Sequence, residues 1–246
     1  MAAHRDGAGV GAVYTDEGVA SELWGAILPR LRAGAIVVDP FCGDGGLLLC
    51  TEALKAARER GVLLIGYDND QAAVDAFNQR AQALVLPRRP VARLLDTILS
   101  PAPSQVDAVI CNPPYLGISK RGEVLGADYQ KRIETRYGKG SMSVDLGALA
   151  AIAAHRFVIP GGLLAIVATN SLWEGRNHRF SFGPLHADNP RTKRYEEGKM
   201  LPYWAKTNVK WKDVRVAVTV NMAAYRVIDE HECCALNLER DLILAA

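Results

Sequence analysis

The chain reads AIVVDPFCGDGG from Ala35 to Gly46, and this stretch decides the fold. The apolar run before Asp39 is typical of a parallel strand that is covered on both faces. Glycine occupies three of the four positions from Gly43 to Gly46, so the backbone of the turn can approach a ligand closely. A helical pattern of apolar residues continues to Arg60. The stretch therefore predicts a strand, a ligand-binding turn and a helix in direct succession.

The acids of this turn indicate which ligand it accepts. The turn has neither the G-x-G-x-x-G pattern of a dinucleotide site nor the Gly-Lys-Ser/Thr ending of a P-loop. The carboxylates of Asp39 and Asp44 would repel a pyrophosphate and attract a cationic ligand. S-adenosyl-L-methionine carries both an ammonium and a sulfonium group. We therefore predict this cofactor for the turn.

Apolar runs alternate with helical patterns along the first two thirds of the chain, and this order indicates the fold class. We expect further strands at residues 62–67, 91–95, 106–111 and 163–168, helices at 16–31, 71–83 and 144–158, and a turn at 160–162. Strands and helices in this order require right-handed crossovers and a parallel sheet. The near alternation of residues 214–220 predicts an antiparallel strand near the C-terminus. The expected fold is α/β, with a Rossmann-like, doubly wound, mostly parallel sheet.

Acids also stand at the ends of the next two expected strands. Asp68 follows the second strand, where an acid can accept hydrogen bonds from a ribose diol. Asp96 follows the third strand and is placed to meet the exocyclic amine of an adenine. For Asp70 we expect no role in binding, but a helix cap or a solvated loop position. Acid-tipped consecutive strands around a glycine turn therefore predict a nucleoside-containing cofactor.

The fourth expected strand ends in Asn112-Pro113-Pro114-Tyr115. Each proline fixes φ and removes a backbone donor, so carbonyls and flanking side chains point outward in a set geometry. An acceptor-rich corner beside an aromatic ring suits a planar group that carries an amine. The alternative is a proline-stiffened turn without chemistry.

Two later segments have no steady period. Residues 116–140 contain five glycines and several charges, so we expect a long mobile loop that contacts the substrate. Residues 171–213 are expected to form a basic, aromatic-rich insertion. The stretch from Arg176 to Arg215 contains ten Lys or Arg residues and only four acids. Lysine and arginine neutralise phosphates while aromatic rings stack on bases, which suits nucleic acid. The alternative is a solvated basic loop with some aromatic rings in the core.

Length and composition frame these motifs. The 246 residues, 49% hydrophobic and 23% charged, suit one main domain over residues 1–246. No apolar run is long enough for a membrane span, and the N-terminus lacks the apolar segment of a signal peptide. We therefore expect a cytoplasmic protein that does not bind membranes. The five cysteines lack paired CxxC spacing, which speaks against a disulfide frame and against a zinc site.

Together the motifs resemble those of class I S-adenosylmethionine-dependent DNA adenine-N6 methyltransferases of the gamma motif order. The resemblance covers about residues 14 to 170 and rests on DPFCGDG at 39–45, GYD at 66–68 and NPPY at 112–115. Residues 112–117, a loop with Tyr129 and Tyr137, and residues 145–146, 160–162 and 169–171 together resemble the catalytic domains of modular restriction-modification enzymes. Within the N-terminal helix segment 1–32, residues 13–16 and the helix after them resemble the tyrosine-threonine-proline segment of this arrangement, although Asp16 replaces the usual proline. The resemblance implies that the segment contacts the cofactor's methionine end.

The resemblance implies a set of site residues. The expected catalytic residues are Asn112, Pro113 and Tyr115. The expected cofactor-binding residues are Tyr14, Thr15, Asp39, Phe41, Cys42, Gly43, Gly45, Asp68, Asn69, Asp96 and Asn112. The expected substrate-binding residues are Tyr115, Leu116, Lys120, Arg121 and Asn170, and no metal is expected.

The residues also account for the implied chemistry. The Asn112 side-chain oxygen and the Pro113 carbonyl can accept the protons of an exocyclic amine and so increase the electron density on its nitrogen. Direct attack on the sulfonium methyl needs no covalent enzyme intermediate, so Cys111 is expected to be a packed strand residue. Tyr115 would stack on a base that is flipped out of the duplex.

DNA adenine methylation is the leading hypothesis, and several alternatives stay open. RNA adenine methylation uses the same chemistry, and a protein glutamine presents a planar amide amine to the same corner. Cytosine-amino methylation and a nucleic-acid-binding module with a degenerate cofactor site are further possibilities. Only about 75 residues follow Asn170, fewer than a large target-recognition domain needs. Recognition would then be reduced, supplied by a separate specificity subunit, or missing from this stretch of chain.

Overall fold

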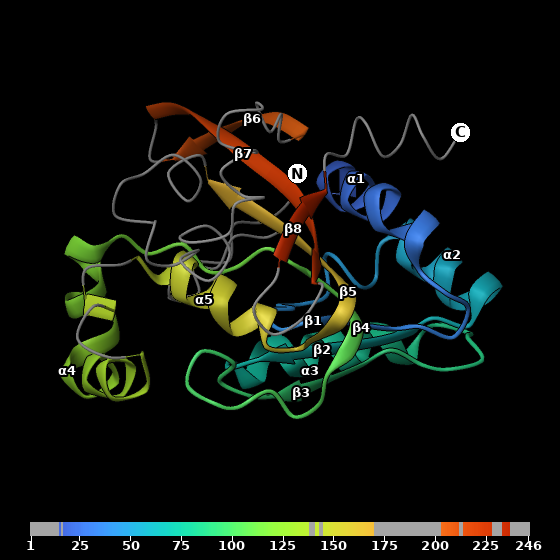
Figure 1. Ribbon diagram of the computed structural model, residues 1–246, viewed down its shortest axis with the longest axis horizontal. Coiled ribbons are helices and arrows are strands. Elements are labelled where there is room, and N and C mark those ends of the chain that lie inside the picture. The colour runs from blue at the N-terminus through green and yellow to red at the C-terminus, as the bar shows by residue number, and fades with distance from the viewer. Residues whose placement is uncertain are drawn as a thin grey trace.

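The computed structural model describes residues 15, 17–137, 141–142, 145–169, 203–211, 214–227 and 233–236. Its helices are α1 (Glu17–Ile27), the 3-10 helix η1 (Leu28–Arg30), α2 (Thr51–Arg60), α3 (Gln71–Gln82), α4 (Ile118–Tyr137) and α5 (Leu146–His155). Its strands are β1 (Ile36–Asp39), β2 (Leu63–Asp68), β3 (Val91–Leu94), β4 (Val106–Cys111), β5 (Val158–Thr169), β6 (Tyr203–Trp211), β7 (Val214–Val227) and β8 (Cys233–Leu236). Figure 1 shows them around one twisted sheet.

The described strands form a single sheet in the order β3-β2-β1-β4-β5-β7-β6, and β8 pairs with β7. The strands from β1 to β5 pair in parallel. From β1 the chain winds outward through β2 to β3, and then returns to β4 on the other side of β1. The order therefore reverses between β1 and β4, where doubly wound sheets bind their ligands. The predicted doubly wound, mostly parallel sheet is confirmed.

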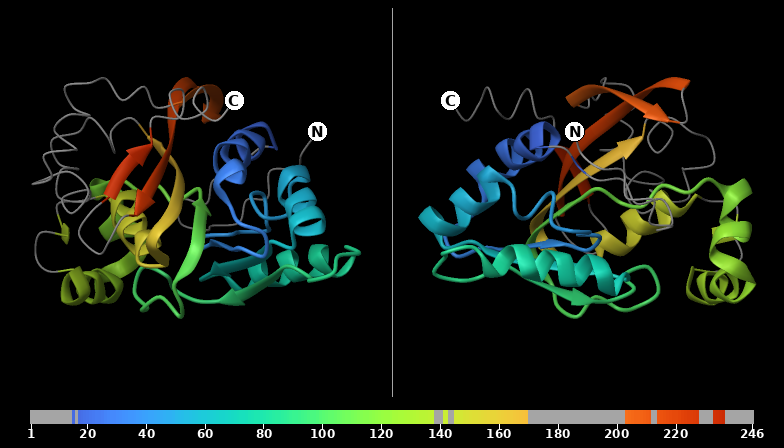
Figure 2. Two further views of the ribbon diagram at one scale, coloured as in Figure 1. Left: turned by 45° about the vertical axis from the view of Figure 1, so that its right-hand side comes forward. Right: turned by 180° about the vertical axis from the view of Figure 1, so that it is seen from behind.

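Side chains of opposite faces alternate along the central strands. Ala108 and Ile110 belong to the core cluster under α1, α2 and α3, whereas Val109 and Cys111 belong to the cluster under α5. Figure 2 shows α5 on the other side of the sheet from α1 and α2. Both faces of β4 are thus covered, which explains its continuous apolar run.

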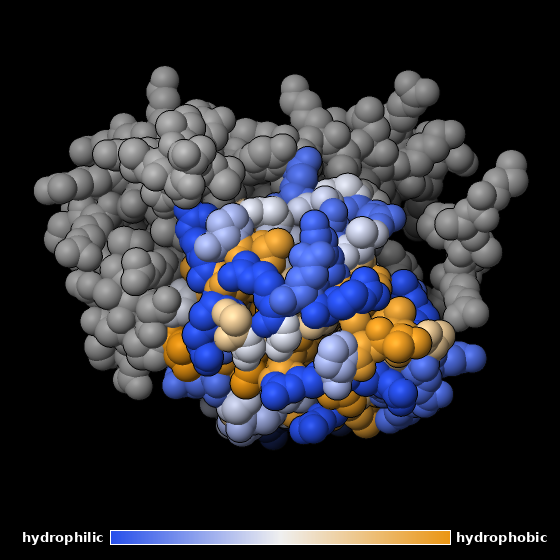
Figure 3. Space-filling view, turned by 90° about the vertical axis from the view of Figure 1, so that its right-hand side faces the viewer, coloured by the Kyte–Doolittle hydropathy of each residue, from blue (hydrophilic) through white to orange (hydrophobic). Residues whose placement is uncertain are grey.

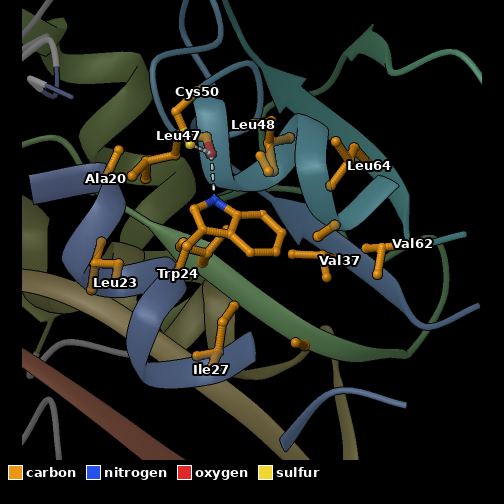
Figure 4. Packing of buried hydrophobic residues seen from close by; sticks show 14 of the residues in the cluster. Ala20, Leu23, Trp24, Ile27, Val37, Leu47, Leu48, Cys50, Val62 and Leu64 are labelled. Atoms are coloured by element: carbon orange, nitrogen blue, oxygen red, sulfur yellow. Dashed lines mark hydrogen bonds between the residues drawn. The ribbon is translucent and has the colours of Figure 1, made fainter. Parts of the chain in front are cut away.

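The N-terminal helix α1 packs behind the glycine turn. Trp24 is fully buried, and its Nε1 donates to the Leu47 carbonyl at 2.7 Å. Figure 4 shows its ring among Leu47, Leu48 and Val37. Residues 46–50 form turns, and α2 begins only at Thr51. The helix expected to start at Gly46 therefore starts later, because the Leu47 carbonyl faces the Trp24 indole.

The C-terminal part of the sheet is antiparallel. β7 pairs with β5, β6 and β8, each in the antiparallel sense. The expected antiparallel strand at residues 214–220 is confirmed, and it extends to Val227. Neither β6 nor β8 was predicted. β6 lies within the segment 171–213, which was expected to be a basic, aromatic-rich insertion. The remainder of that segment lies outside the described residues.

Residues 160–162 do not form the expected turn between α5 and the fifth strand. They lie inside β5, opposite a register shift between Val106 and Ala108 of β4. A Cβ on Gly162 would lie 2.7 Å from Val158 and 2.8 Å from the Asp107 carbonyl. Gly162 thus permits a close approach of backbone within a bulged pair of strands, rather than a reversal of the chain.

The prediction of a long mobile loop at residues 116–140 was wrong for most of this segment. Residues Ile118–Tyr137 form α4, which is interrupted by Gly126 at φ 75° and ψ 163°. Arg121, Gln130 and Ile133 are buried, so long-range packing stabilises a helix whose sequence has no steady period. The segment is therefore helical, and its expected role in substrate binding stays a prediction.

The described surface carries no feature of a membrane span or a metal centre. None of the helices described is long and apolar enough to cross a bilayer. The described side chains also include no group of three or more His, Cys, Asp or Glu residues arranged to hold a metal ion. On the face seen in Figure 3, hydrophilic residues are interspersed with hydrophobic ones.

Candidate functional site

Four polar residues stand at the carboxyl ends of neighbouring parallel strands. Asp39 ends β1, Asp68 ends β2, Asp96 follows β3, and Asn112 follows β4. The parallel register pairs Asp39 with Gly66 and Val38 with Val109, so these strands end at one edge of the sheet. The predicted acid-tipped strands and the proline corner are thus brought to the same edge.

The glycine turn, residues 39–46, lies across the end of β2. The Gly43 amide donates to Asp68 Oδ2 at 2.8 Å, and the Cys42 amide donates to the Tyr67 carbonyl at 2.9 Å. A Cβ on Gly66 would lie 2.6 Å from Cys42 Sγ, so glycine at that position makes room for the thiol. Main-chain donors therefore join the turn to the strand tip that carries Asp68.

Gly45 requires glycine for two reasons. Its φ is +102°, a conformation that side chains with a Cβ rarely adopt. A Cβ there would also lie 2.7 Å from Leu49 and 2.9 Å from Phe77. The turn thus packs directly on α3 and on Leu49, just before α2.

Burial controls the charge of the two acids at the turn. Burial raises the pKa of Asp39 well above its ordinary range, the hydrogen bond from the Phe41 amide at 3.0 Å lowers it, and the nearby Asp68 raises it further. Burial likewise raises the pKa of Asp68, although the amides of Asp70 and Gly43 favour its ionised form. Burial disfavours the ionised form of both carboxyls, and a cationic ligand beside them would stabilise that form.

The cysteines at the site are packing residues. Burial raises the pKa of Cys42, and Cys111 is fully buried with a raised pKa for the same reason. Cys50 is also buried, and these three cysteines are free thiols. A protonated, inaccessible thiol is a poor nucleophile, so the position of Cys111 agrees with its predicted packing role.

Thr15 joins the proline corner to the glycine turn. Asn112 Nδ2 donates to Thr15 Oγ1 at 3.0 Å, across 97 residues of sequence. A Cβ on Gly46 would lie 3.1 Å from the Thr15 carbonyl, so the turn touches the Thr15 backbone as well. Because the Asn112 amide nitrogen faces Thr15, its oxygen faces away from Thr15. Tyr14, predicted to contact the cofactor, lies outside the described residues.

Two contacts hold the Tyr115 side chain in place. Its hydroxyl donates to the Val167 carbonyl on β5, and burial raises its pKa, so the hydroxyl stays protonated. A Cβ on Gly147 would lie 3.1 Å from Tyr115 Cδ1, so α5 supports one side of the ring. The ring is therefore fixed beside Asn112.

Two further residues tie the third strand tip to its surroundings. Thr97 is buried and donates through Oγ1 to the Pro40 carbonyl at 2.9 Å, which ties the loop after β3 to the glycine turn. Tyr129 of α4 donates to Asp96 Oδ1 at 3.2 Å. No role was predicted for Thr97, although its position beside a strand-tip acid is a usable signal. Tyr129 belongs to the family resemblance, but its contact with Asp96 was not predicted.

Not every predicted residue lies open at this edge. Arg121 is buried and bonds to Gln130 and to the Ser141 carbonyl, so its guanidinium is engaged inside the α4 region. The Leu116 carbonyl accepts a hydrogen bond from the Leu146 amide at 3.0 Å. The Leu116 side chain packs beside α4 and α5. Lys120 and Asn69 are exposed, and Phe41 is half-buried. Asn170 lies outside the described residues.

The sequence of this chain is similar to a family model and to several known proteins. Residues 27–144 match the family model of the RMKL-like methyltransferase domain. The chain is 30% identical over 149 residues to the Type II methyltransferase M.BanIII of Aneurinibacillus aneurinilyticus, which covers 54% of the chain and 24% of that protein. It is 29% identical over 105 residues to the tRNA (guanine(10)-N2)-dimethyltransferase of Methanocaldococcus jannaschii, covering 39% of the chain and 28% of that protein. The chain thus spans about a quarter of the length of these curated relatives.

Solved structures share the fold. A protein of Listeria monocytogenes described as a class I S-adenosylmethionine-dependent methyltransferase superposes with a TM-score of 0.58 at 13% identity, over 92% of this chain and 64% of the other. A Vibrio vulnificus protein described as a modification subunit of a type I restriction enzyme gives a TM-score of 0.52 at 17% identity, over 89% of this chain and 45% of the other. The predicted class I methyltransferase fold is confirmed.

Proposed function

We propose that this chain is an S-adenosyl-L-methionine-dependent methyltransferase that acts on the exocyclic amine of adenine in DNA. The observation that carries the proposal is the corner at Asn112–Tyr115, which ends β4 and is joined through Thr15 to the glycine turn. An amine-binding corner and a turn suited to a sulfonium thus share one edge of the sheet. The match to the RMKL-like methyltransferase domain supports the same reaction class.

The residues of the edge fit the cofactor. Asp39 and Asp68 offer carboxylates to its cationic end or its ribose, and the glycine turn leaves room for close approach of a ligand to the backbone. Asp96 would accept the adenine amine. When bound, S-adenosyl-L-methionine supplies an electrophilic methyl group on sulfur.

Asn112 and Pro113 would prepare the substrate amine. With its amide nitrogen directed to Thr15, Asn112 presents its oxygen away from Thr15 as an acceptor for one N–H of the amine. The Pro113 carbonyl is the second acceptor, since a proline carries no competing donor of its own. Two acceptors on the N–H groups increase the electron density on a nitrogen that is otherwise a poor nucleophile.

Tyr115 would hold the base. Its anchored hydroxyl and the support from Gly147 restrict the ring, and a restricted ring stacks on a flipped base at a low entropic cost. Lys120 is exposed at the start of α4, just beyond the corner, where it could meet a phosphate of the strand that carries the base. The sequence of residues 171–213, rich in basic and aromatic residues, is compatible with the same partner.

Methylation of an RNA base is the second candidate. The match to a tRNA (guanine(10)-N2)-dimethyltransferase favours it, because the guanine amine is also exocyclic and suits the same corner. The match to a Type II methyltransferase favours DNA and is longer, with 149 residues against 105. Since the chain spans about a quarter of these relatives, we also propose that target recognition resides in a further domain or a separate subunit.

Transfer of a tritiated methyl group to separate pools of DNA, RNA and protein tests the proposal. After digestion, N6-methyladenine in DNA is the expected product. Label in an RNA base would select the second candidate, and label in glutamine would identify a protein methyltransferase. Absence of cofactor binding by calorimetry, with Asp68→Ala making no difference, would contradict the whole proposal and favour a nucleic-acid-binding module.

A further inference from the structure

Asp96 is held by two donors from different parts of the chain. Its Oδ1 accepts from the Leu99 amide at 3.0 Å and from the Tyr129 hydroxyl at 3.2 Å. The two oxygens of a carboxylate lie in one plane and point apart, so fixing Oδ1 also fixes the direction of Oδ2. The Leu99 amide belongs to the same loop, whereas Tyr129 reaches Asp96 from helix α4.

Helix α4 is docked along this loop at further points. The Tyr137 hydroxyl donates to the Ile98 carbonyl at 2.6 Å, and Arg136 donates to the Ser100 carbonyl at 2.8 Å. Ile98 and Ile133 share a core cluster against which both tyrosines pack. The Tyr129 hydroxyl therefore has a fixed position relative to Asp96. The hydrogen bonds of Tyr137 and Arg136 also hold the helix against this loop.

The hydroxyl is suited to orient a carboxylate. Burial and the neighbouring Asp96 raise the pKa of Tyr129, so the group remains a neutral donor. A neutral donor on Oδ1 orients the carboxyl and leaves Oδ2 to accept from a second donor. An amine is such a donor, whereas a carbonyl oxygen at the same place would meet the carboxylate as a second acceptor.

We infer that Tyr129 is a positioning residue that orients the Asp96 carboxylate toward the adenine amine of the cofactor, so that helix α4 contributes to cofactor selectivity. The inference rests on the proposed function and adds a residue and a helix to it. It also links the segment that follows the Asn112 corner to the far end of the cofactor site.

Binding of two ligands by calorimetry tests the inference. S-adenosyl-L-homocysteine carries the amine, and S-inosyl-L-homocysteine carries a ring carbonyl in its place. We expect the wild-type chain to bind the first ligand roughly tenfold or more tightly, as a hydrogen bond to a charged group implies. Tyr129→Phe removes the hydroxyl and keeps the ring, and it should reduce this preference severalfold. Asp96→Asn should reduce it as well, because an amide can also donate to the carbonyl.

Tyr137→Phe is the matched control. It removes a hydroxyl of the same helix that bonds to the same loop, but to the Ile98 backbone and not to Asp96. A merely structural role of these tyrosines predicts equal effects of the two variants, whereas a positioning role predicts that only Tyr129→Phe changes the preference. Both ligands are measured on one preparation, so a smaller folded fraction cancels from the ratio.

The outcomes separate the inference from the proposed function. A wild-type preference that survives in Tyr129→Phe overturns the inference alone, as does a preference that falls equally in Tyr137→Phe. A wild-type chain that binds both ligands equally shows that Asp96 does not read the amine, which also overturns the inference and leaves the methyltransferase proposal standing. Failure to bind either ligand overturns both.

Discussion

The glycine turn and helix α4 flank the same site but are built differently. The turn is held by main-chain amides and by glycines at positive φ, such as the Gly43 amide on Asp68 and Gly45 at +102°. Helix α4 is held by side chains: Arg121 bonds to Gln130 at 3.1 and 2.9 Å and to the Ser141 carbonyl at 2.9 Å. Gln130 in turn donates to the Arg121 carbonyl at 2.9 Å.

This difference teaches which parts of a site a sequence can disclose. A turn built from backbone groups needs glycines and acids at set spacings, and these are visible in one dimension. A helix that is also docked by side chains on a distant segment, as Tyr137 on Ile98 and Arg136 on Ser100, needs only partners that meet in space. If the comparison is right, substitutions in the two regions should affect different properties.

The largest effect is expected at the junction of the two regions. Asn112→Ala removes the side-chain acceptor proposed for the substrate amine and should lower methyl transfer by roughly 10²–10³-fold. Cofactor affinity should remain nearly intact, since the strand-tip acids and the glycine turn are unchanged. Single-turnover transfer and calorimetry measure the two quantities, and equal transfer in the variant would refute the assigned role.

A methyl group in the glycine turn should break the backbone-built region. Gly45→Ala combines positive φ with contacts of 2.7 Å to Leu49 and 2.9 Å to Phe77, and we expect a loss of about 2–4 kcal/mol in unfolding free energy. Gly61→Ala is the control, because Gly61 has φ +66° but no atom within 4 Å of its Cβ. Its loss should be only about 1–2 kcal/mol. Urea denaturation compares them, and equal losses would mean that packing on α3 is unimportant.

Arg121→Met should loosen helix α4 alone. The variant leaves Gln130 and the Ser141 carbonyl without their buried donor, at a cost of about 1–3 kcal/mol. Hydrogen exchange should accelerate in α4 and remain unchanged in β1–β4. Lys131→Met, on an exposed position of the same helix, should change stability by no more than about 0.5 kcal/mol. Faster exchange throughout the sheet would show that the two regions are not independent.

The smallest effect concerns pH. A buried carboxyl with a raised pKa binds its proton more tightly in the folded chain, so stability falls as the pH rises from its ordinary value of 3.8 through the raised folded-state pKa. Asp39→Asn removes this titration, so stability should depend less on pH over this range. At a pH above the raised pKa of Asp39, the variant should be more stable than the wild type. Asp75→Asn, at an exposed position, should leave the slope in place. Denaturation between pH 4 and about pH 8 measures it, and an unchanged slope in Asp39→Asn would assign the dependence elsewhere.

Much of the fold followed from local patterns. Strands β1 to β4 lie within two residues of their expected bounds, because each is an apolar run too short for a helix and is flanked by turn-forming residues. The errors fell where tertiary contacts override local preference. Gly162 reads as a turn residue but fills a bulge in β5, and the glycines of residues 116–140 read as a loop although Gly126 merely interrupts α4.

The sequence by itself determined the doubly wound sheet, the glycine turn, the acids at the strand tips and the stiff corner at Asn112. Each depends on periodicity or on the conformational limits of glycine and proline, which act between neighbours in the chain. Only the tertiary structure decided that Thr15 meets Asn112, that Arg121 is buried, and that Tyr129 reaches Asp96. These contacts join residues far apart in the sequence, and packing of the whole chain selects them from many possible partners.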